Sequence, residues 1–164
     1  MPTKNEIRVL NLLSATDLDH DVDPGKVIQD WGNEAITVAC EAALGSYPGL
    51  DRKTRYNAVS SLAGMSHVQA QETVALLVRD PDSDVSIRAL RAAGRQRNKA
   101  VVKDLSALLQ TPTLPRLVAV EVVKALVAID TPDAQAALQA YEAGDPARLL
   151  HRADPLVTSY LPKP

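Results

Sequence analysis

Alternating carboxylates are the first feature of the sequence whose residue types could do chemistry. Asp17, Asp19, Asp21 and Asp23 occupy every second position, with His20 among them. Hard cations such as Ca²⁺ bind several carboxylate oxygens in one loop. An EF-hand loop, however, needs a glycine at its sixth position and a glutamate at its twelfth, and neither a start at Asp17 nor one at Asp19 supplies them. We therefore predict a solvated acidic loop in which Asp23 caps the next helix, and keep these four aspartates only as the residues that would form a metal site.

Positive charge collects in the middle of the chain. From Arg88 to Lys103 the sequence contains six basic residues and no acidic one. Arg88, Arg91 and Arg95 have the i, i+3, i+7 spacing that places side chains on one face of a helix. Such a stripe could contact phosphates, but no aromatic residue lies within it and acidic residues flank it.

Three interpretations of this basic stripe remain open. A solvated helix face is preferred. An acidic protein partner comes second, and the acidic N-terminal part of the same protein is one candidate through self-association. Nucleic acid comes last. The residues of this basic edge are Arg88, Arg91, Arg95, Arg97 and Lys99.

No combination of residues indicates a catalytic site. A histidine-centred site needs a base near its nucleophile or a cluster of ligands. The histidines His20, His67 and His151 lie in three distant segments. The single cysteine, Cys40, is interpreted as a small buried residue. Glycine-rich phosphate loops, serine nucleophile elbows and zinc-ligand spacings are absent from the sequence. We expect no catalytic residue and no cofactor, with His67 capping a helix and His151 exposed.

The composition is that of one compact domain. The 164 residues are 46% hydrophobic and 23% charged, while aromatic residues make up 3% and phenylalanine is absent. Leu, Val, Ala and Ile must therefore fill the interior, which suits closely packed helices. The formal net charge of −2 argues against nucleic-acid binding through bulk positive charge. No apolar run reaches the ~18 residues of a membrane span and no signal-peptide pattern is visible, so we expect a cytoplasmic protein without membrane contact.

Helix-capping residues divide the chain into short helices. Thr3 with Glu6, and Ser66 with Gln69, have capping-box spacing. Other polar residues precede apolar stretches, several of them with proline at the first helical position. These caps are Asp23, Asp51, Asp84, Asn98, Thr131, Asp145 and Asp154. The spacing predicts helices near 4–14, 25–45, 52–64, 67–79, 85–95, 99–110, 115–129, 132–143, 146–152 and 155–160.

The predicted helices repeat. Ala58, Ala89 and Val122 occupy the same position in three first helices, at spacings of 31 and 33 residues. The second helices keep this register, because each has small or apolar residues twelve and sixteen positions later. The two extra residues of the second interval fit the linker 111–115. Self-similarity with a period of roughly 20–50 residues indicates a solenoid.

At these positions the chain resembles the HEAT-repeat family, particularly its short bacterial form found in phycobilisome-lyase-like proteins. The resemblance covers roughly 51–143, and the turns 80–85 and 129–134 carry it best. Ser86 and Ala119 depart from the arginine that the family usually has there. The resemblance implies a scaffold formed by a curved stack of helix pairs, whose inner surface is lined by the second helix of each pair.

We predict an all-α fold, a right-handed α-solenoid of HEAT-like helix pairs with capping helices at both ends. The single domain, 1–164, would comprise an N-terminal cap or diverged first pair (1–50), three repeats (51–80, 81–112 and 113–144) and a C-terminal cap and tail (145–164). The predicted cap cores are Leu10, Leu13, Val27, Ile28 and Trp31 at one end, and Leu149, Leu150, Leu156, Val157, Tyr160 and Leu161 at the other.

A non-catalytic protein-binding scaffold or adaptor is the function that we expect. If second helices line the concave side, the side chains opposite their buried positions would face another protein or peptide. These partner-binding residues are Glu72, Arg79, Lys103, Gln110 and Gln139. The alternatives are a lyase or chaperone-like component that handles a chromophore or an acceptor protein, and an immunity- or antitoxin-type inhibitor of a partner protein. We expect a monomer or weak self-association.

Overall fold

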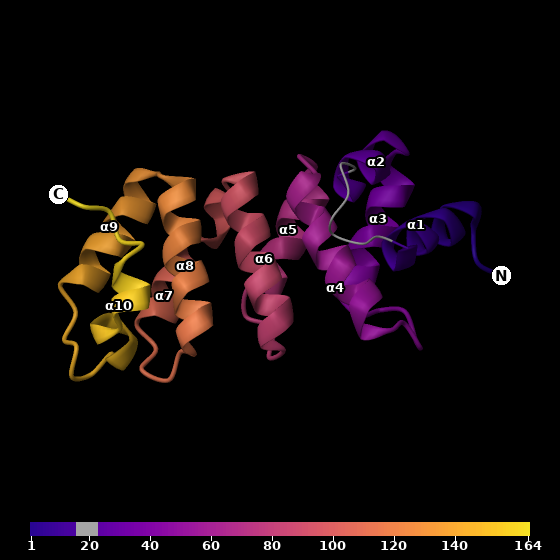
Figure 1. The fold of residues 1–164 in the computed structure, drawn as a ribbon. Coiled ribbons are helices and arrows are strands. Elements are labelled where there is room, and N and C mark those ends of the chain that lie inside the picture. The colour runs from indigo at the N-terminus through magenta and orange to yellow at the C-terminus, as the bar shows by residue number, and fades with distance from the viewer. Residues whose placement is uncertain (16–22) are drawn as a thin grey trace.

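The computed structural model describes residues 1–15 and 23–164. Over these ranges it contains helices and connecting turns but no β-strand. The helices stack side by side along one axis, and the two ends of the chain lie at opposite ends of the stack (Figure 1). The predicted all-α solenoid is confirmed.

Three helix pairs form the middle of the stack. The first helices are α4 (Arg52–Ser61), α6 (Ser83–Gln96) and α8 (Arg116–Ile129), and the second helices are α5 (Val68–Leu77), α7 (Val102–Leu109) and α9 (Pro132–Glu142). The 3-10 turn η1 (Leu62–Gly64) lies between α4 and α5, and the 3-10 turn η2 (Lys99–Val101) lies between α6 and α7. Before them come α1 (Lys4–Ala15), α2 (Pro24–Asp30) and α3 (Asn33–Ala43), and after them η3 (Leu150–Ala153) and α10 (Pro155–Thr158).

The helix caps follow the repeat register. Asp51 caps α4 by accepting a hydrogen bond from the Thr54 amide at 2.8 Å, and Asp82 caps α6 by accepting one from the Asp84 amide at 2.9 Å. Pro115 occupies the corresponding position before α8. These three caps are separated by 31 and 33 residues, the spacings found for the buried first-helix positions. Asp82 is thus the cap of α6, and not Asp84 as predicted, because the helix begins two residues earlier than predicted.

The turns inside the pairs keep the same spacing. His67, Asn98 and Thr131 each accept a hydrogen bond from a backbone amide at the start of the following helical segment, at 3.1 to 3.2 Å. The predicted capping box of Ser66 with Gln69 is therefore wrong. The amide and hydroxyl of Ser66 donate instead to Gln29 Oε1 on α2, at 2.7 and 3.3 Å.

The core is a line of small aliphatic side chains between neighbouring helices. Ala58, Ala89 and Val122 have no exposed surface. Gly94 on α6 lies against α8, since a Cβ atom placed on it would be 3.3 Å from Ala125 Cα and 3.5 Å from Ala128 Cβ. Two first helices can approach this closely only because these side chains are small.

Two predicted helices differ from the structure. The segment 25–45 is two helices, α2 and α3, because Gly32 has a φ of 101°, which side chains rarely permit. The segment 146–152 is not a helix. Asp145 accepts a hydrogen bond from the Ala147 amide in a turn, and Leu149 leaves helical geometry with a ψ of 86°, so that only η3 follows.

The N-terminal cap packs as predicted around Leu13 and Ile28, which are fully buried. Trp31 is half-buried, and the Arg8 guanidinium lies 4.5 Å from the centre of its ring while Arg8 Nη2 donates to its carbonyl at 3.2 Å. Among the described helices, none combines the length and the apolar character that crossing a membrane requires.

Candidate functional site

The residues predicted to bind a partner lie along the second helices. Glu72, Lys103 and Gln139 are exposed on α5, α7 and α9, respectively. Gln110 follows α7 and is half-buried, whereas Arg79 lies beyond α5 and is exposed. The structure brings only Lys103 and Gln110 together, because both line one groove.

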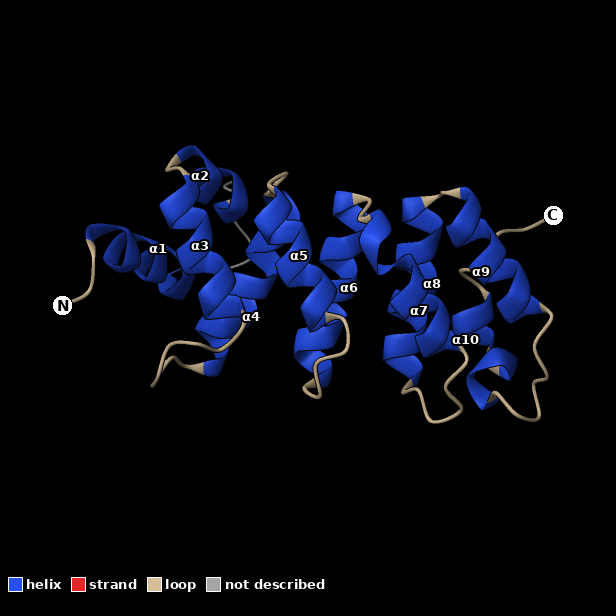
Figure 2. Cartoon of the chain, turned by 180° about the vertical axis from the view of Figure 1, so that it is seen from behind, coloured by secondary structure: helices blue, strands red, loops and turns tan. Residues whose placement is uncertain are grey.

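That groove runs between α7 and α9 and has a volume of about 590 Å³. The view in Figure 2 has these two helices, together with α5, on the near side of the solenoid. Alanines of both helices, among them Ala107 and Ala140, form much of the lining, and alanine side chains allow another polypeptide to approach closely. The polar residues that line it are Lys99, Lys103, Ser106, Gln110 and Asp133.

Large apolar side chains are exposed on α5, the neighbouring second helix. Val68 is 63% exposed and Leu76 is 69% exposed, and Glu72 lies one helical turn from each. We call Val68, Glu72, Leu76 and the α7–α9 groove the second-helix surface. The sequence did not indicate the exposure of Val68 and Leu76, because apolar residues on a helix normally mark its buried side.

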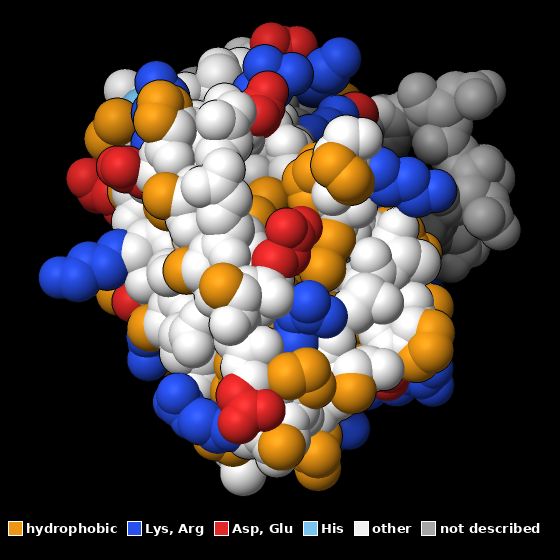
Figure 3. Space-filling view, turned by 90° about the vertical axis from the view of Figure 1, so that its left-hand side faces the viewer, with side chains coloured by type: hydrophobic (Ala, Val, Ile, Leu, Met, Phe, Trp, Pro, Cys, Tyr) orange, Lys and Arg blue, Asp and Glu red, His pale blue; other side chains and the backbone are white. Residues whose placement is uncertain are grey.

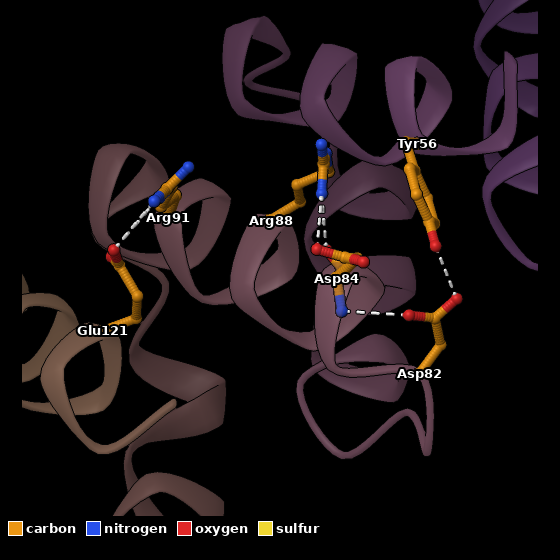
Figure 4. Close-up of polar contacts among 6 residues, drawn as sticks. All are labelled: Tyr56, Asp82, Asp84, Arg88, Arg91 and Glu121. Atoms are coloured by element: carbon orange, nitrogen blue, oxygen red, sulfur yellow. Dashed lines mark hydrogen bonds and ion pairs between the residues drawn. The ribbon is translucent and has the colours of Figure 1, made fainter. Parts of the chain in front are cut away.

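The predicted basic stripe lies on α6, the first helix of the middle pair, and its arginines are paired with carboxylates. Arg88 Nη1 is 3.6 Å from Asp84 Oδ1, and the Arg88 guanidinium lies 4.5 Å from the centre of the Tyr56 ring. The Tyr56 hydroxyl donates to Asp82 Oδ2 at 2.8 Å (Figure 4). Burial and this hydrogen bond raise the pKa of Tyr56. Burial acts to raise the pKa of Asp82 as well, but the hydrogen bonds that it accepts lower it below its ordinary value.

Arg91 binds a buried carboxylate on the next first helix. Its Nε and Nη2 atoms both donate to Glu121 Oε1, at 3.1 and 3.0 Å (Figure 4). The Glu121 side chain is only 8% exposed, and Lys124 Nζ lies 4.0 Å from the same oxygen. The sequence did not single out Glu121 and Lys124, although Glu121 is the only acidic residue of α8.

Arg95 joins the middle pair to the N-terminal cap. Its Nη2 atom lies 2.6 Å from Asp23 Oδ2, while Asp23 Oδ1 accepts from the Gly25 amide at 3.0 Å. The Asp23 carboxylate fits here because Gly64 has no side chain, since a Cβ atom there would lie 2.5 Å from Asp23 Oδ1. The basic stripe and an acidic residue of the N-terminal segment therefore meet within one chain.

The other residues of the basic edge lie in the turn after α6. Arg97 ends α6 in the left-handed conformation, with a φ of 48°, and Lys99 begins η2. Both side chains are exposed, and Lys99 belongs to the α7–α9 groove. The predicted edge is thus divided between the two faces of the solenoid.

Of the four metal candidates, only Asp23 lies among the described residues. Asp17, Asp19 and Asp21 lie outside the described residues, and Asp23 serves as a helix cap and as the partner of Arg95. Within 1–15 and 23–164 there is no group of three or more His, Cys, Asp or Glu side chains that could hold a metal ion.

The histidines and the cysteine have structural roles where they are described. His67 caps α5, as predicted. The prediction that His151 is exposed is wrong, because its Nε2 atom donates to the Thr111 carbonyl at 3.0 Å and its Nδ1 atom lies 2.7 Å from the Tyr141 hydroxyl. Cys40 is buried, and burial raises the pKa of its thiol, which disfavours the reactive thiolate.

The C-terminal end of the solenoid carries charges of both signs. In Figure 3, most of its surface is uncharged, and basic and acidic side chains lie singly or in small mixed groups. No broad field of one sign covers this end, so electrostatic attraction here would depend on individual side chains.

The comparison with protein families agrees with this architecture. The family described as HEAT repeats matches residues 42–119 and 70–153 in two overlapping stretches. No curated protein and no solved structure matched the chain. The protein is therefore an α-solenoid. It belongs to the HEAT-repeat family.

Proposed function

We propose that this protein is a non-catalytic, cytoplasmic scaffold or adaptor that binds another protein through its second-helix surface. The observation that supports this most is the α7–α9 groove, whose alanine walls leave a volume of about 590 Å³ next to α5. Exposed Val68 and Leu76 add apolar surface beside it, and such residues are typical of the buried centre of a protein interface.

The charges of this surface favour a polypeptide over a polyanion. Glu72, Lys103 and Asp133 provide both signs within the same row of helices. Scattered charges of opposite sign set the orientation of a partner and exclude wrong partners more than they increase affinity. The arginines of α6, by contrast, are engaged with carboxylates of this chain, which supports the second helices over the basic edge as the main site.

Filling the groove tests this proposal. A photo-crosslinking amino acid at Ala107 would capture the bound protein in the native extract. Ala140→Trp should then reduce recovery of the captured protein at least about ten-fold, since a loss of 1.4 kcal/mol already gives that factor. The matched control is Ala143→Trp, because Ala143 is exposed just after α9 but does not line the groove.

Charge reversal separates the two candidate surfaces. Lys103→Glu should weaken the captured complex, whereas Arg97→Glu should leave its recovery unchanged. Equal recovery from the wild type, Ala140→Trp and Lys103→Glu would reject the second-helix surface. Loss with Arg97→Glu alone would assign binding to the basic edge instead.

The alternative functions make different predictions. A phycobilisome-lyase-like component would retain a chromophore, so freshly purified protein would absorb visible light and have a native mass above that of the chain. An immunity- or antitoxin-type inhibitor would also use a protein-binding surface, but its captured partner would lose its own activity on binding. Activity of the captured partner, measured with and without this protein, distinguishes an inhibitor from a scaffold.

A further inference from the structure

We propose that the first helices carry a second, separate site, in which a cationic notch between α6 and α8 binds acidic side chains of a partner protein. The notch has a volume of about 220 Å³. Arg91 and Arg95 of α6 and Lys124 of α8 line it, together with Gly94, Ala125 and Ala128.

Small residues make the floor of the notch. Gly94 has no side chain, and Ala125 and Ala128 lie against it from α8. Because the floor residues are short, the long side chains of Arg91, Arg95 and Lys124 rise around it. Three cations are thus held around one depression, where a carboxylate could reach more than one of them.

The three cations retain donors that face solvent. The side chain of Arg91 is 63% exposed, that of Arg95 is 55% exposed, and that of Lys124 is 46% exposed. Arg91 uses Nε and Nη2 on Glu121, which leaves Nη1 without a hydrogen-bond partner among the described residues. Arg95 donates a hydrogen bond only from Nη2, to Asp23. Lys124 Nζ lies 4.0 Å from Glu121 Oε1, farther than the Arg91 nitrogens that donate to the same oxygen.

The notch already binds carboxylates within this chain. Glu121 receives two hydrogen bonds from Arg91, which holds the guanidinium in a fixed orientation. Asp23 reaches Arg95 from a position 72 residues away in the sequence. Three cations and these two carboxylates leave a net positive charge, so a further carboxylate is complementary to the notch.

A nucleic acid fits the same face less well. Bases bind single strands largely by stacking on aromatic rings, but the Arg88 guanidinium covers a face of Tyr56 and Lys124 Nζ lies 5.2 Å from the centre of the Tyr160 ring. Carboxylates of an acidic peptide need no aromatic ring to stack on and can bind the exposed donors of the three cations directly.

This site lies on the other side of the solenoid from the proposed main surface. The first helices α6 and α8 face the viewer in Figure 1, and the second helices α7 and α9 face the viewer in Figure 2. A short solenoid with two independent surfaces can hold two polypeptides at once. A substitution that abolishes binding at one of these surfaces should therefore leave binding at the other unchanged.

Titration with a fluorescein-labelled octaglutamate peptide at low ionic strength tests the proposal. Fluorescence anisotropy should show binding that weakens with added salt. Lys124→Gln should raise the dissociation constant about two- to five-fold, the range expected for one exposed ion pair, and the double variant Arg95→Gln/Lys124→Gln roughly ten-fold or more. Lys103→Gln is the matched control, since it removes one exposed lysine from the second-helix surface and should change affinity less than about two-fold.

Two further measurements locate the binding. Backbone amide signals of Gly94, Ala125 and Ala128 should shift on titration of the wild type, while those of Ala107 and Ala140 should not. Absence of binding, or equal weakening by Lys103→Gln and Lys124→Gln, would overturn the proposal. Tighter binding of a single-stranded oligonucleotide of equal charge would assign the notch to nucleic acid. The Ala140→Trp variant should bind octaglutamate like the wild type, which separates this test from that of the main surface.

Discussion

Tyr141 and His151 attach the C-terminal cap to the last helix pair. Among the described residues, Tyr141 is the largest fully buried side chain, and its ring stacks on His151 with the ring centres 5.6 Å apart. Because a carbonyl can only accept, His151 donates from Nε2 to Thr111, and Nδ1 accepts from the Tyr141 hydroxyl. One histidine therefore connects α9, the loop before α8 and the C-terminal cap.

The variant Tyr141→Phe should be less stable at neutral pH by roughly 1–3 kcal/mol, because His151 Nδ1 would lose its buried donor. Burial raises the pKa of Tyr141 to about 12, a rise that the charge of Arg152 reduces and that of Asp154 supports. The contribution of Tyr141 to the free energy of unfolding is complete below pH ~10 and is lost as the pH rises towards about 12, because the unfolded chain releases the proton first.

Urea denaturation of the wild type and Tyr141→Phe at pH 7, 10 and 11 checks this expectation. The free energy of unfolding of the variant should fall less steeply between pH 10 and 11 than that of the wild type. Tyr160→Phe is the control, because Tyr160 is exposed and its hydroxyl is not part of this contact. Parallel profiles for wild type and Tyr141→Phe would contradict the role given to the hydroxyl.

The first helices α6 and α8 end in the same unusual way. Arg97 and Asp130 follow them with φ angles of 48° and 50°, in the left-handed region that favours glycine. The two residues are 33 residues apart, which is the repeat spacing of these pairs. The helix-ending conformation therefore belongs to the repeat, and this sequence adopts it without the glycine that would permit it most easily.

We expect Arg97→Gly to be more stable than Arg97→Ala by about 1 kcal/mol. Both variants remove the same exposed side chain, but only alanine keeps a Cβ atom in the left-handed conformation, where it costs roughly 1–2 kcal/mol. The greater flexibility of glycine in the unfolded chain offsets part of this difference. Thermal or chemical denaturation of the two variants measures it, and equal stabilities would mean that the turn changes conformation in the variants.

The sequence predicted those elements whose signals are local. Capping residues such as Asp51 and Thr131, and the register of Ala58, Ala89 and Val122, depend on spacings within about one repeat. The break at Gly32 was missed because a single glycine inside a helical pattern is compatible with a continuous helix. The burial of His151 was missed for another reason, since its two partners come from different elements.

The candidate surfaces were predictable only in part. The helix spacing correctly placed Arg88, Arg91 and Arg95 on one face, but their carboxylate partners depend on which helices lie side by side. Glu121 and Asp23 approach α6 from opposite directions, 30 residues after Arg91 and 72 residues before Arg95. The exposure of Leu76 likewise depends on the absence of a covering element among the described residues.

The whole solenoid depends on its ends, because each pair contacts mainly its neighbours. At the C-terminal end, Leu149 and Val157 are fully buried, and α10 packs against α8. These two side chains cover the last pair in the way that a further repeat would. The stability of α8 and α9 should therefore depend on the cap although the cap contains no complete repeat.

Removal of residues 145–164 should lower the free energy of unfolding by at least about 3 kcal/mol, the lower limit for exposing two buried aliphatic side chains. Amide hydrogen exchange should accelerate most in α8 and α9, and least in α1 and α3. Removal of residues 162–164 alone is the control and should leave exchange unchanged, because these residues are exposed. Uniform acceleration along the chain would indicate one cooperative unit in place of neighbour-by-neighbour coupling.

The ion pair between Asp23 and Arg95 also bears on the order of folding. Contacts in a helical solenoid are mostly local, and local contacts form quickly. This pair closes a ring of more than seventy residues, which carries a loop-closure entropy cost that a neighbouring pair does not. The docking of α2 onto η1 and α6 should then follow the formation of the middle pair, so that Arg95→Gln would accelerate unfolding of the N-terminal segment without slowing the folding of the repeats.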